Sequence, residues 1–175
     1  MFLTTHAAAG VLISHYVKNP YEVFGLAFAS HFVLDFIPHG DESLYHDDEW
    51  KILKKFKWPI IINLFDLAGL LAVIFYAINH PGDTTGRLML VGIIGSILPD
   101  FLSYLFPVLH EKMSWLFLMR WLYKLTKPTG LRYLIRAQNW IHNLLHHEII
   151  RRDIPFWAGL ATQLGLIAVF MYFSR

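Results

Sequence analysis

Long apolar stretches alternate with polar segments along the chain. Four stretches approach the 20 or so mostly apolar residues that a helix needs to cross a bilayer. They are Pro20–Ile37, Trp58–Ile78, Arg87–Phe106 and Pro155–Phe173. A fifth stretch, Leu3–Val17, is shorter and rich in small residues, which suits a helix packed closely inside a bundle. The pattern predicts an all-α fold, a polytopic membrane helical bundle with about five transmembrane helices.

Two further segments are amphipathic. Met113–Lys127 alternates large apolar residues with basic ones, which predicts a helix lying in the membrane interface. Leu131–Arg152 predicts another helix, with arginine and histidine along one side. No internal repeat or low-complexity tract divides the chain, so residues 1–175 are expected to form a single integral membrane domain.

The composition supports a lipid environment. The chain is 55% hydrophobic and 16% charged, against about 45–50% apolar and 25% charged in soluble domains. The absence of cysteine excludes disulfides, thiolate zinc sites and thiol nucleophiles. A net charge of +2 argues against nucleic acid as a partner and leaves membrane lipid as the expected one.

Lysine and arginine are distributed unevenly between the predicted spans. Residues 38–57 carry four of them and residues 107–154 carry eight, whereas the opposite side has Lys18, Arg87 and Arg175. Because cytoplasmic loops are enriched in lysine and arginine, the bias places the N-terminus in the cytoplasm and the C-terminus outside. We therefore expect a multi-pass protein of the cell inner (cytoplasmic) membrane.

Three aspartates, Asp35, Asp66 and Asp100, fall inside predicted spans. A carboxylate in hydrocarbon costs about 2.5–3.5 kcal/mol, so each needs a partner or a metal ion. The topology puts all three near the cytoplasmic face, together with the candidate ligands His6, His31, His39, His142 and His146. Residues four apart share a helix face, so His31/Asp35 and His142/His146 are plausible ligand pairs.

Histidine and carboxylate without thiolate suit one or two divalent metal ions, zinc first, with manganese and iron as alternatives. Other interpretations stay open at this point. Asp66, which lies near Asn63, can instead be a group that hydrogen-bonds two helices together. The same acids and histidines can also line the path of a metal or proton carrier, or hold a structural metal in a membrane scaffold.

Four pieces of the chain resemble motifs of the YdjM-like inner-membrane proteins, described as membrane-bound metal-dependent hydrolases. They are Ser30-His31-Phe32-Val33-Leu34-Asp35-Phe36-Ile37-Pro38-His39-Gly40-Asp41, Thr5-His6-Ala7, Gly95-Ser96-Ile97-Leu98-Pro99-Asp100 and Trp140-Ile141-His142-Asn143-Leu144-Leu145. The family is more distantly similar to zinc-dependent phospholipase C and P1 nuclease, helical enzymes that bind metals through histidine and aspartate. The resemblance implies a metal-dependent hydrolase.

Together, these observations lead us to expect a membrane-embedded hydrolase that cleaves a phosphoester, either a lipid or a lipid-linked phosphate. The metal ligands are expected to be His6, His31, Asp35, His39, Asp100 and His146. Asp66, as a further ligand or a base, and His142 are the expected catalytic residues. Arg132 and Arg136 share a helix face and are expected to bind the substrate phosphate.

Overall fold

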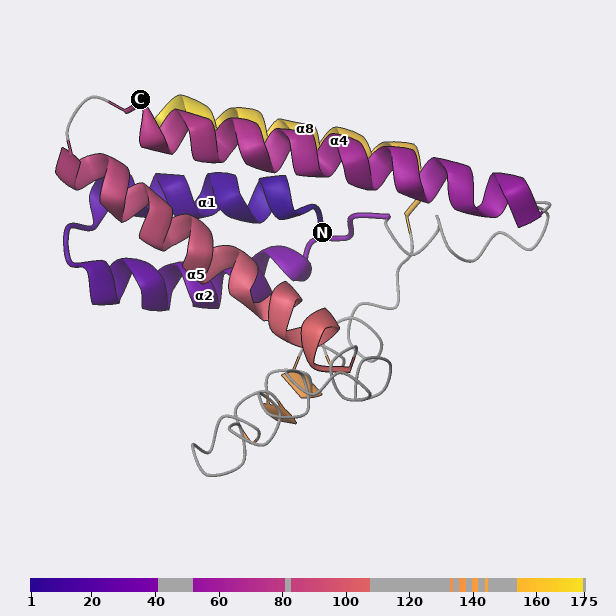
Figure 1. The fold of residues 1–175 in the computed structure, drawn as a ribbon, viewed down its shortest axis with the longest axis horizontal. Helices are drawn as coiled ribbons and strands as arrows, with labels where there is room; N and C mark the ends of the chain where they lie inside the picture. Colours follow the sequence, from indigo (N-terminus) through magenta and orange to yellow (C-terminus); the bar gives the residue numbers. More distant parts are fainter. Residues whose placement is uncertain are drawn as a thin grey trace, which may run out of the picture.

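The computed structural model describes residues 1–40, 52–80, 83–107 and 154–174, together with residues 133, 136–137, 140–141 and 144. These residues form helices and no strand, as the apolar pattern predicts. The long helices are shown in Figure 1 and are α1 (Leu3–Tyr16), α2 (Pro20–Asp35), α4 (Ile52–Ile78), α5 (Asp83–Pro107) and α8 (Phe156–Phe173).

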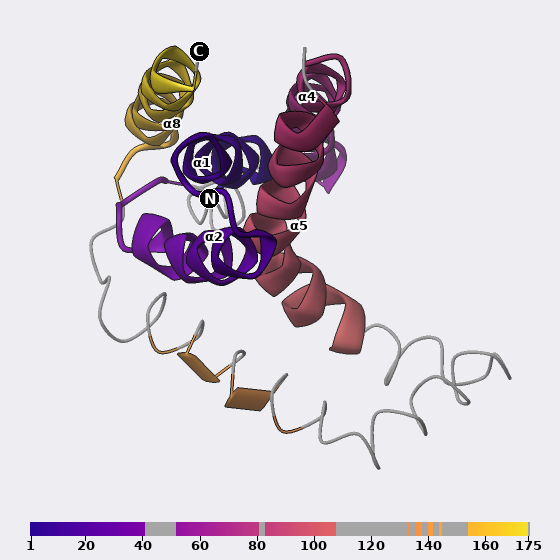
Figure 2. The ribbon, with the colours of Figure 1, turned by 90° about the vertical axis from the view of Figure 1, so that its left-hand side faces the viewer.

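Helix α1 lies at the centre of the bundle. It packs against α2, α4, α5 and α8, which surround it in the end-on view of Figure 2. Every residue from Thr4 to Val11 is buried. A helix enclosed on all sides must be apolar or small around its whole circumference, which explains the run Ala7-Ala8-Ala9-Gly10.

Small residues let α1 approach its neighbours closely. At the crossing of α1 and α5, Gly10 and Gly92 lie against each other, and a methyl group on either would collide with the backbone carbonyl of the other. At the start of α1, a methyl group on Gly69 of α4 would lie 2.6 Å from the Thr4 hydroxyl oxygen. Close backbone contact of this kind is typical of helix pairs in membranes.

Helix α2 begins at a strong local signal. The Asn19 side chain accepts a hydrogen bond of 3.0 Å from the Tyr21 amide, and Pro20 occupies the first helical position. Asparagine caps free amides at a helix start, and proline there loses no helical hydrogen bond. The short turn between Tyr16 and Pro20 therefore sends α2 back along α1.

Three of the five predicted spans have the length and apolarity to cross a membrane: Ile60–Ile78, Thr85–Ser103 and Phe156–Phe173. Helices α1 and α2 have 14 and 16 residues, or about 21 and 24 Å, which is shorter than a hydrocarbon core of about 30 Å. Within the described residues three such spans are found, and the expected count of five stays a prediction. Enclosure by other helices explains the short length of α1, because a helix buried in protein need not match the thickness of the lipid.

Several predicted features lie outside the described residues. They are the interfacial helix Met113–Lys127, most of Leu131–Arg152, and the side chains of Arg132, His142 and His146.

Candidate metal centre

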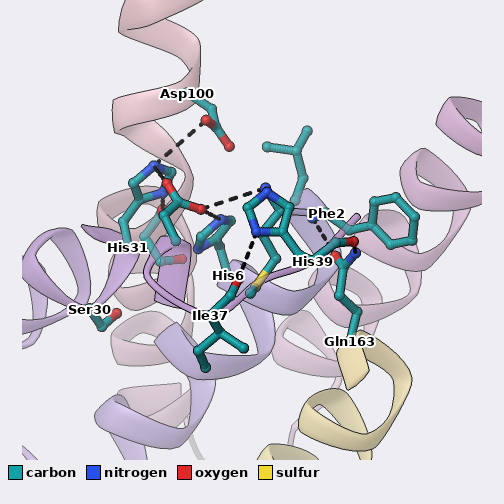
Figure 3. Close-up of polar contacts among 12 residues, drawn as sticks. Phe2, His6, Ser30, His31, Ile37, His39, Asp100 and Gln163 are labelled. Carbon is teal, nitrogen blue, oxygen red and sulfur yellow. Dashed lines mark hydrogen bonds and ion pairs between the residues drawn. The ribbon is translucent and has the colours of Figure 1, made fainter. Parts of the chain in front are cut away.

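Three helices bring four ionisable side chains together at the end of the bundle where α1 begins (Figure 3). His6 lies in the first turn of α1, His31 and Asp35 lie in the last turns of α2, and Asp100 lies in the second half of α5. The side chains of His6 and His31 are completely buried, that of Asp35 is 1% exposed and that of Asp100 is 13% exposed. We call these four residues the His–Asp group.

Asp35 connects the two histidines of the group. Its Oδ1 lies 3.3 Å from His6 Nε2, and its Oδ2 lies 3.1 Å from His31 Nε2. Asp100 Oδ1 lies 3.6 Å from the same His31 nitrogen. The imidazole rings of His6 and His31 stack, with centroids 4.1 Å apart and an angle of 25° between the planes. The i, i+4 spacing of His31 and Asp35 thus produces the contact that it predicts.

The separations in the group fit a coordination shell. Two ligand atoms bound tetrahedrally to zinc, each about 2.0–2.1 Å from it, lie about 3.3 Å apart. A charge-assisted N–H···O hydrogen bond is about 2.7–2.9 Å long. His6 supports the first geometry, because neither of its buried ring nitrogens makes a hydrogen bond within the described residues. One ligand atom each from His6, His31 and Asp100 all lie within 4.8 Å of one another, so this group can hold a metal ion.

The tautomer of His31 is fixed by α5. Its Nδ1 lies 2.8 Å from the backbone carbonyl oxygen of Ser96. A carbonyl can only accept, so Nδ1 carries a proton, and Nε2 faces Asp35 and Asp100. Metal-binding histidines commonly donate their second nitrogen to a carbonyl or carboxylate in this way. Pro99, in the next turn of α5, has no amide hydrogen and interrupts the helical ladder just before Asp100.

His39 lies beside the group rather than inside it. Its Nδ1 donates a hydrogen bond of 2.8 Å to the Ile37 carbonyl, and its Nε2 accepts one of 2.9 Å from the Met1 amino group. That amino group lies 3.5 Å from Asp35 Oδ1. His39 therefore reaches the His–Asp group through the Met1 nitrogen.

Asp66 lies at the start of α1 and binds backbone amides there. Its Oδ2 accepts a hydrogen bond from the Leu3 amide and its Oδ1 accepts one from the Thr4 amide, each 2.9 Å long. The Thr4 hydroxyl also lies 2.7 Å from Oδ1. Within the described residues, no hydrogen bond or ion pair joins Asp66 to the His–Asp group. The carboxylate instead caps the start of α1, which matches the alternative role as a helix–helix hydrogen-bonding group.

Gln163 is a buried polar residue that the sequence reasoning passed over. Its Oε1 accepts a hydrogen bond of 2.7 Å from the Phe2 amide, and its Nε2 donates one of 3.2 Å to the His39 carbonyl. The side chain is completely buried. The available signal was a lone amide in the middle of the uncharged helix Phe156–Phe173, since a polar side chain in such a helix needs a partner.

The structure describes only one of the remaining predicted site residues, Arg136. Arg136 is helical and exposed. Arg132, His142 and His146 lie outside the described residues, so their predicted roles stay predictions.

Comparison with known proteins adds no family assignment, because no family model, curated protein or solved structure matches the chain. The resemblance to the YdjM-like proteins therefore stays a prediction based on the motifs themselves. The chain has membrane-length apolar helices and a buried group of histidine and aspartate that can hold a metal ion.

Proposed function

We propose that this protein is a membrane-embedded, metal-dependent hydrolase of a phosphoester, either a lipid or a lipid-linked phosphate. The observation that carries the proposal is the His–Asp group, in which the three contacts between a carboxylate oxygen and an imidazole nitrogen measure 3.1 to 3.6 Å. One or two divalent ions would bind there, zinc being the first candidate because the ligands are nitrogen and oxygen.

A metal ion held by these residues would lower the pKa of bound water, and a pair of ions would also stabilise the attacking and leaving oxygens of a phosphoester. Residues of the chain hold the imidazole ligands in place. Ser96 holds His31 in one tautomer, and Asp35 lies between both imidazoles. Asp100 is the most exposed member of the group, so the substrate is proposed to approach from its side.

The proposed orientation has the N-terminus and the site on the cytoplasmic side of the inner membrane, as the lysine and arginine distribution indicates. The site would then lie near the depth of the lipid head groups, where a lipid substrate can arrive sideways between helices. The two shorter helices, α1 and α2, would complete a five-helix membrane domain. Arg132 and Arg136 stay candidates for contacting the substrate phosphate, with His142 and His146 as additional site residues.

The test begins with metal content. Wild-type protein purified in detergent should contain zinc or a similar ion. Asp35→Asn and His31→Ala should bind the ion about 10–100-fold more weakly, the loss seen when residues that support a metal site are changed. His80→Ala is the matched control, since its ring contacts Tyr76 and no member of the group. Unchanged metal content in both ligand variants would refute the site.

Hydrolysis is measured next, with phosphatidic acid, phospholipid diesters and a soluble aryl phosphate as substrates. Activity should require the metal, disappear with a chelator and return when the ion is added back. The absence of hydrolysis in metal-loaded protein across this panel would refute the enzymatic part of the proposal.

One observation favours a second candidate, a structural metal. Structural sites are closed, whereas catalytic sites keep a position open to water or substrate, and three of the four side chains in the group are at most 1% exposed. A structural role predicts that chelation lowers the melting temperature while no substrate is hydrolysed. A catalytic role predicts that chelation abolishes turnover.

A further inference from the structure

Helix α8 contacts the bundle close to the His–Asp group. Among the described helices it packs mainly against α1, and it also lies against the chain that follows α2. A methyl group on Gly159 would collide with the backbone at His39 and Gly40. The backbone of α8 therefore lies directly against the segment that leads out of the His–Asp group.

Gln163 lies one turn further along α8 and makes two hydrogen bonds across this contact. Its side chain joins the Phe2 amide to the His39 carbonyl. Phe2 is the residue that precedes α1, and its own carbonyl accepts hydrogen bonds from the amides of Thr5 and His6. His39 follows Asp35 by four residues. One amide group thus ties the backbone next to His6 to the backbone next to Asp35.

We propose that Gln163 is a positioning residue for the metal group, and that it couples α8 to the occupancy of the site. The inference rests on the proposed function, because it requires that His6 and Asp35 share a metal ion. A metal bound by both residues draws together the same two backbone segments that Gln163 connects. Metal binding and the Gln163 bridge therefore stabilise each other, since coupling between two binding events is reciprocal.

The variant test uses Gln163→Met, which keeps the length of the side chain and removes both hydrogen bonds. Titration with Co²⁺, followed by its visible absorption, should show affinity about tenfold weaker than in the wild type, the lower end of the range for residues that support ligands. Gln163→Glu keeps the acceptor for the Phe2 amide and should lose less. Thr162→Val is the matched control, because within the described part of the chain its hydroxyl bonds only to the Ala158 carbonyl of the same helix.

A second measurement needs no variant. Hydrogen exchange of the wild-type protein, followed by mass spectrometry, should slow on addition of Zn²⁺ in peptides that cover Phe2 and residues 156–165. In Gln163→Met the same addition should protect the peptide with His31 and Asp35 but leave α8 unprotected. A merely structural glutamine would lower the melting temperature without changing metal affinity or metal-dependent exchange.

The outcomes separate the two proposals. Wild-type protein that binds neither Co²⁺ nor Zn²⁺ overturns the proposed function and this inference with it. Wild-type protein that binds metal overturns only the inference if Gln163→Met binds within twofold of it, if Thr162→Val loses as much, or if Zn²⁺ leaves the exchange of α8 unchanged.

Discussion

The two roles considered for Asp66 give opposite results for Asp66→Asn. If Asp66 were a metal ligand or a base, asparagine would keep its size, the protein would fold normally and metal-dependent activity would disappear. In the structure, both carboxylate oxygens accept hydrogen bonds from backbone amides at the start of α1. Asparagine has one oxygen and one NH₂ group, so it can accept from one of these amides only, and its NH₂ group faces the other.

The expected loss of stability follows from the hydrogen bond that one backbone amide loses and from the loss of the negative charge. A hydrogen bond to a charged group contributes about 1.5–3 kcal/mol net, and a negative charge at a helix start contributes about 0.3–1 kcal/mol. Asp66 is only partly buried, which favours the lower ends of both ranges, or about 2 kcal/mol together. For a chain of this size that corresponds to a fall of about 4–8 °C in melting temperature.

The assay is thermal unfolding in detergent, followed by tryptophan fluorescence, alongside Co²⁺ binding and turnover. Asp66→Asn should melt earlier, bind metal more weakly than wild type because the turn that carries His6 is loosened, and recover full turnover at saturating metal. Asn63→Ala, an exposed change on the same helix, should leave the melting temperature unchanged. An unchanged melting temperature together with turnover that saturating metal cannot restore would refute the capping role and return Asp66 to the chemistry.

Two other predictions concern the bundle. Gly92→Ala should cost about 1–3 kcal/mol of stability because its methyl group meets the Gly10 carbonyl. Gly25→Ala should cost nothing, because a methyl group there meets nothing within 4 Å. Equal melting temperatures of the two variants would contradict the close crossing of α1 and α5. Cysteines introduced in place of Asp83 and Lys54 should differ in their labelling by an impermeant reagent in intact cells, because only position 83 is expected to face the outside. Labelling at position 54 would contradict the proposed orientation.

Much of the bundle could be predicted from the sequence because apolar length and i, i+4 spacing are local properties. Most helix bounds lie near the ends of the apolar stretches, although α4 begins at Ile52 rather than at Trp58. His31 meets Asp35 because residues four apart share a helix face. Juxtaposition of His6 and Asp100 with this pair required one further step. The lysine and arginine asymmetry gave each helix a direction, and the directions brought the polar ends of α1, α2 and α5 to one side.

The partners of Asp66 and Gln163 could not be predicted in the same way. Both side chains bind backbone groups near the start of α1, and backbone amides leave no mark in the pattern of side chains. A buried aspartate in an apolar helix signals that it has a partner, but metal ions and free helix amides are both suitable partners for a carboxylate. Which of them lies opposite Asp66 depends on the lateral packing of α4 against α1. That packing is set by Gly69, where the absence of a side chain makes room for Thr4.

The charges of the His–Asp group limit how many protons its histidines can carry. Asp35 and Asp100 bring two carboxylates into a buried site, where charge without compensation is costly, and the Met1 amino group, 3.5 Å from Asp35 Oδ1, supplies one positive charge. Protonating both histidines would place two cations in rings stacked 4.1 Å apart, and like charges at that distance repel strongly in a medium of low dielectric constant. A divalent ion held by His6, His31 and Asp100 would also compensate the carboxylates, and it would require both imidazoles to be neutral, as metal ligands are. The stacking of His6 on His31 is therefore compatible with a bound metal or with a single protonated imidazole, and it argues against the protonation of both.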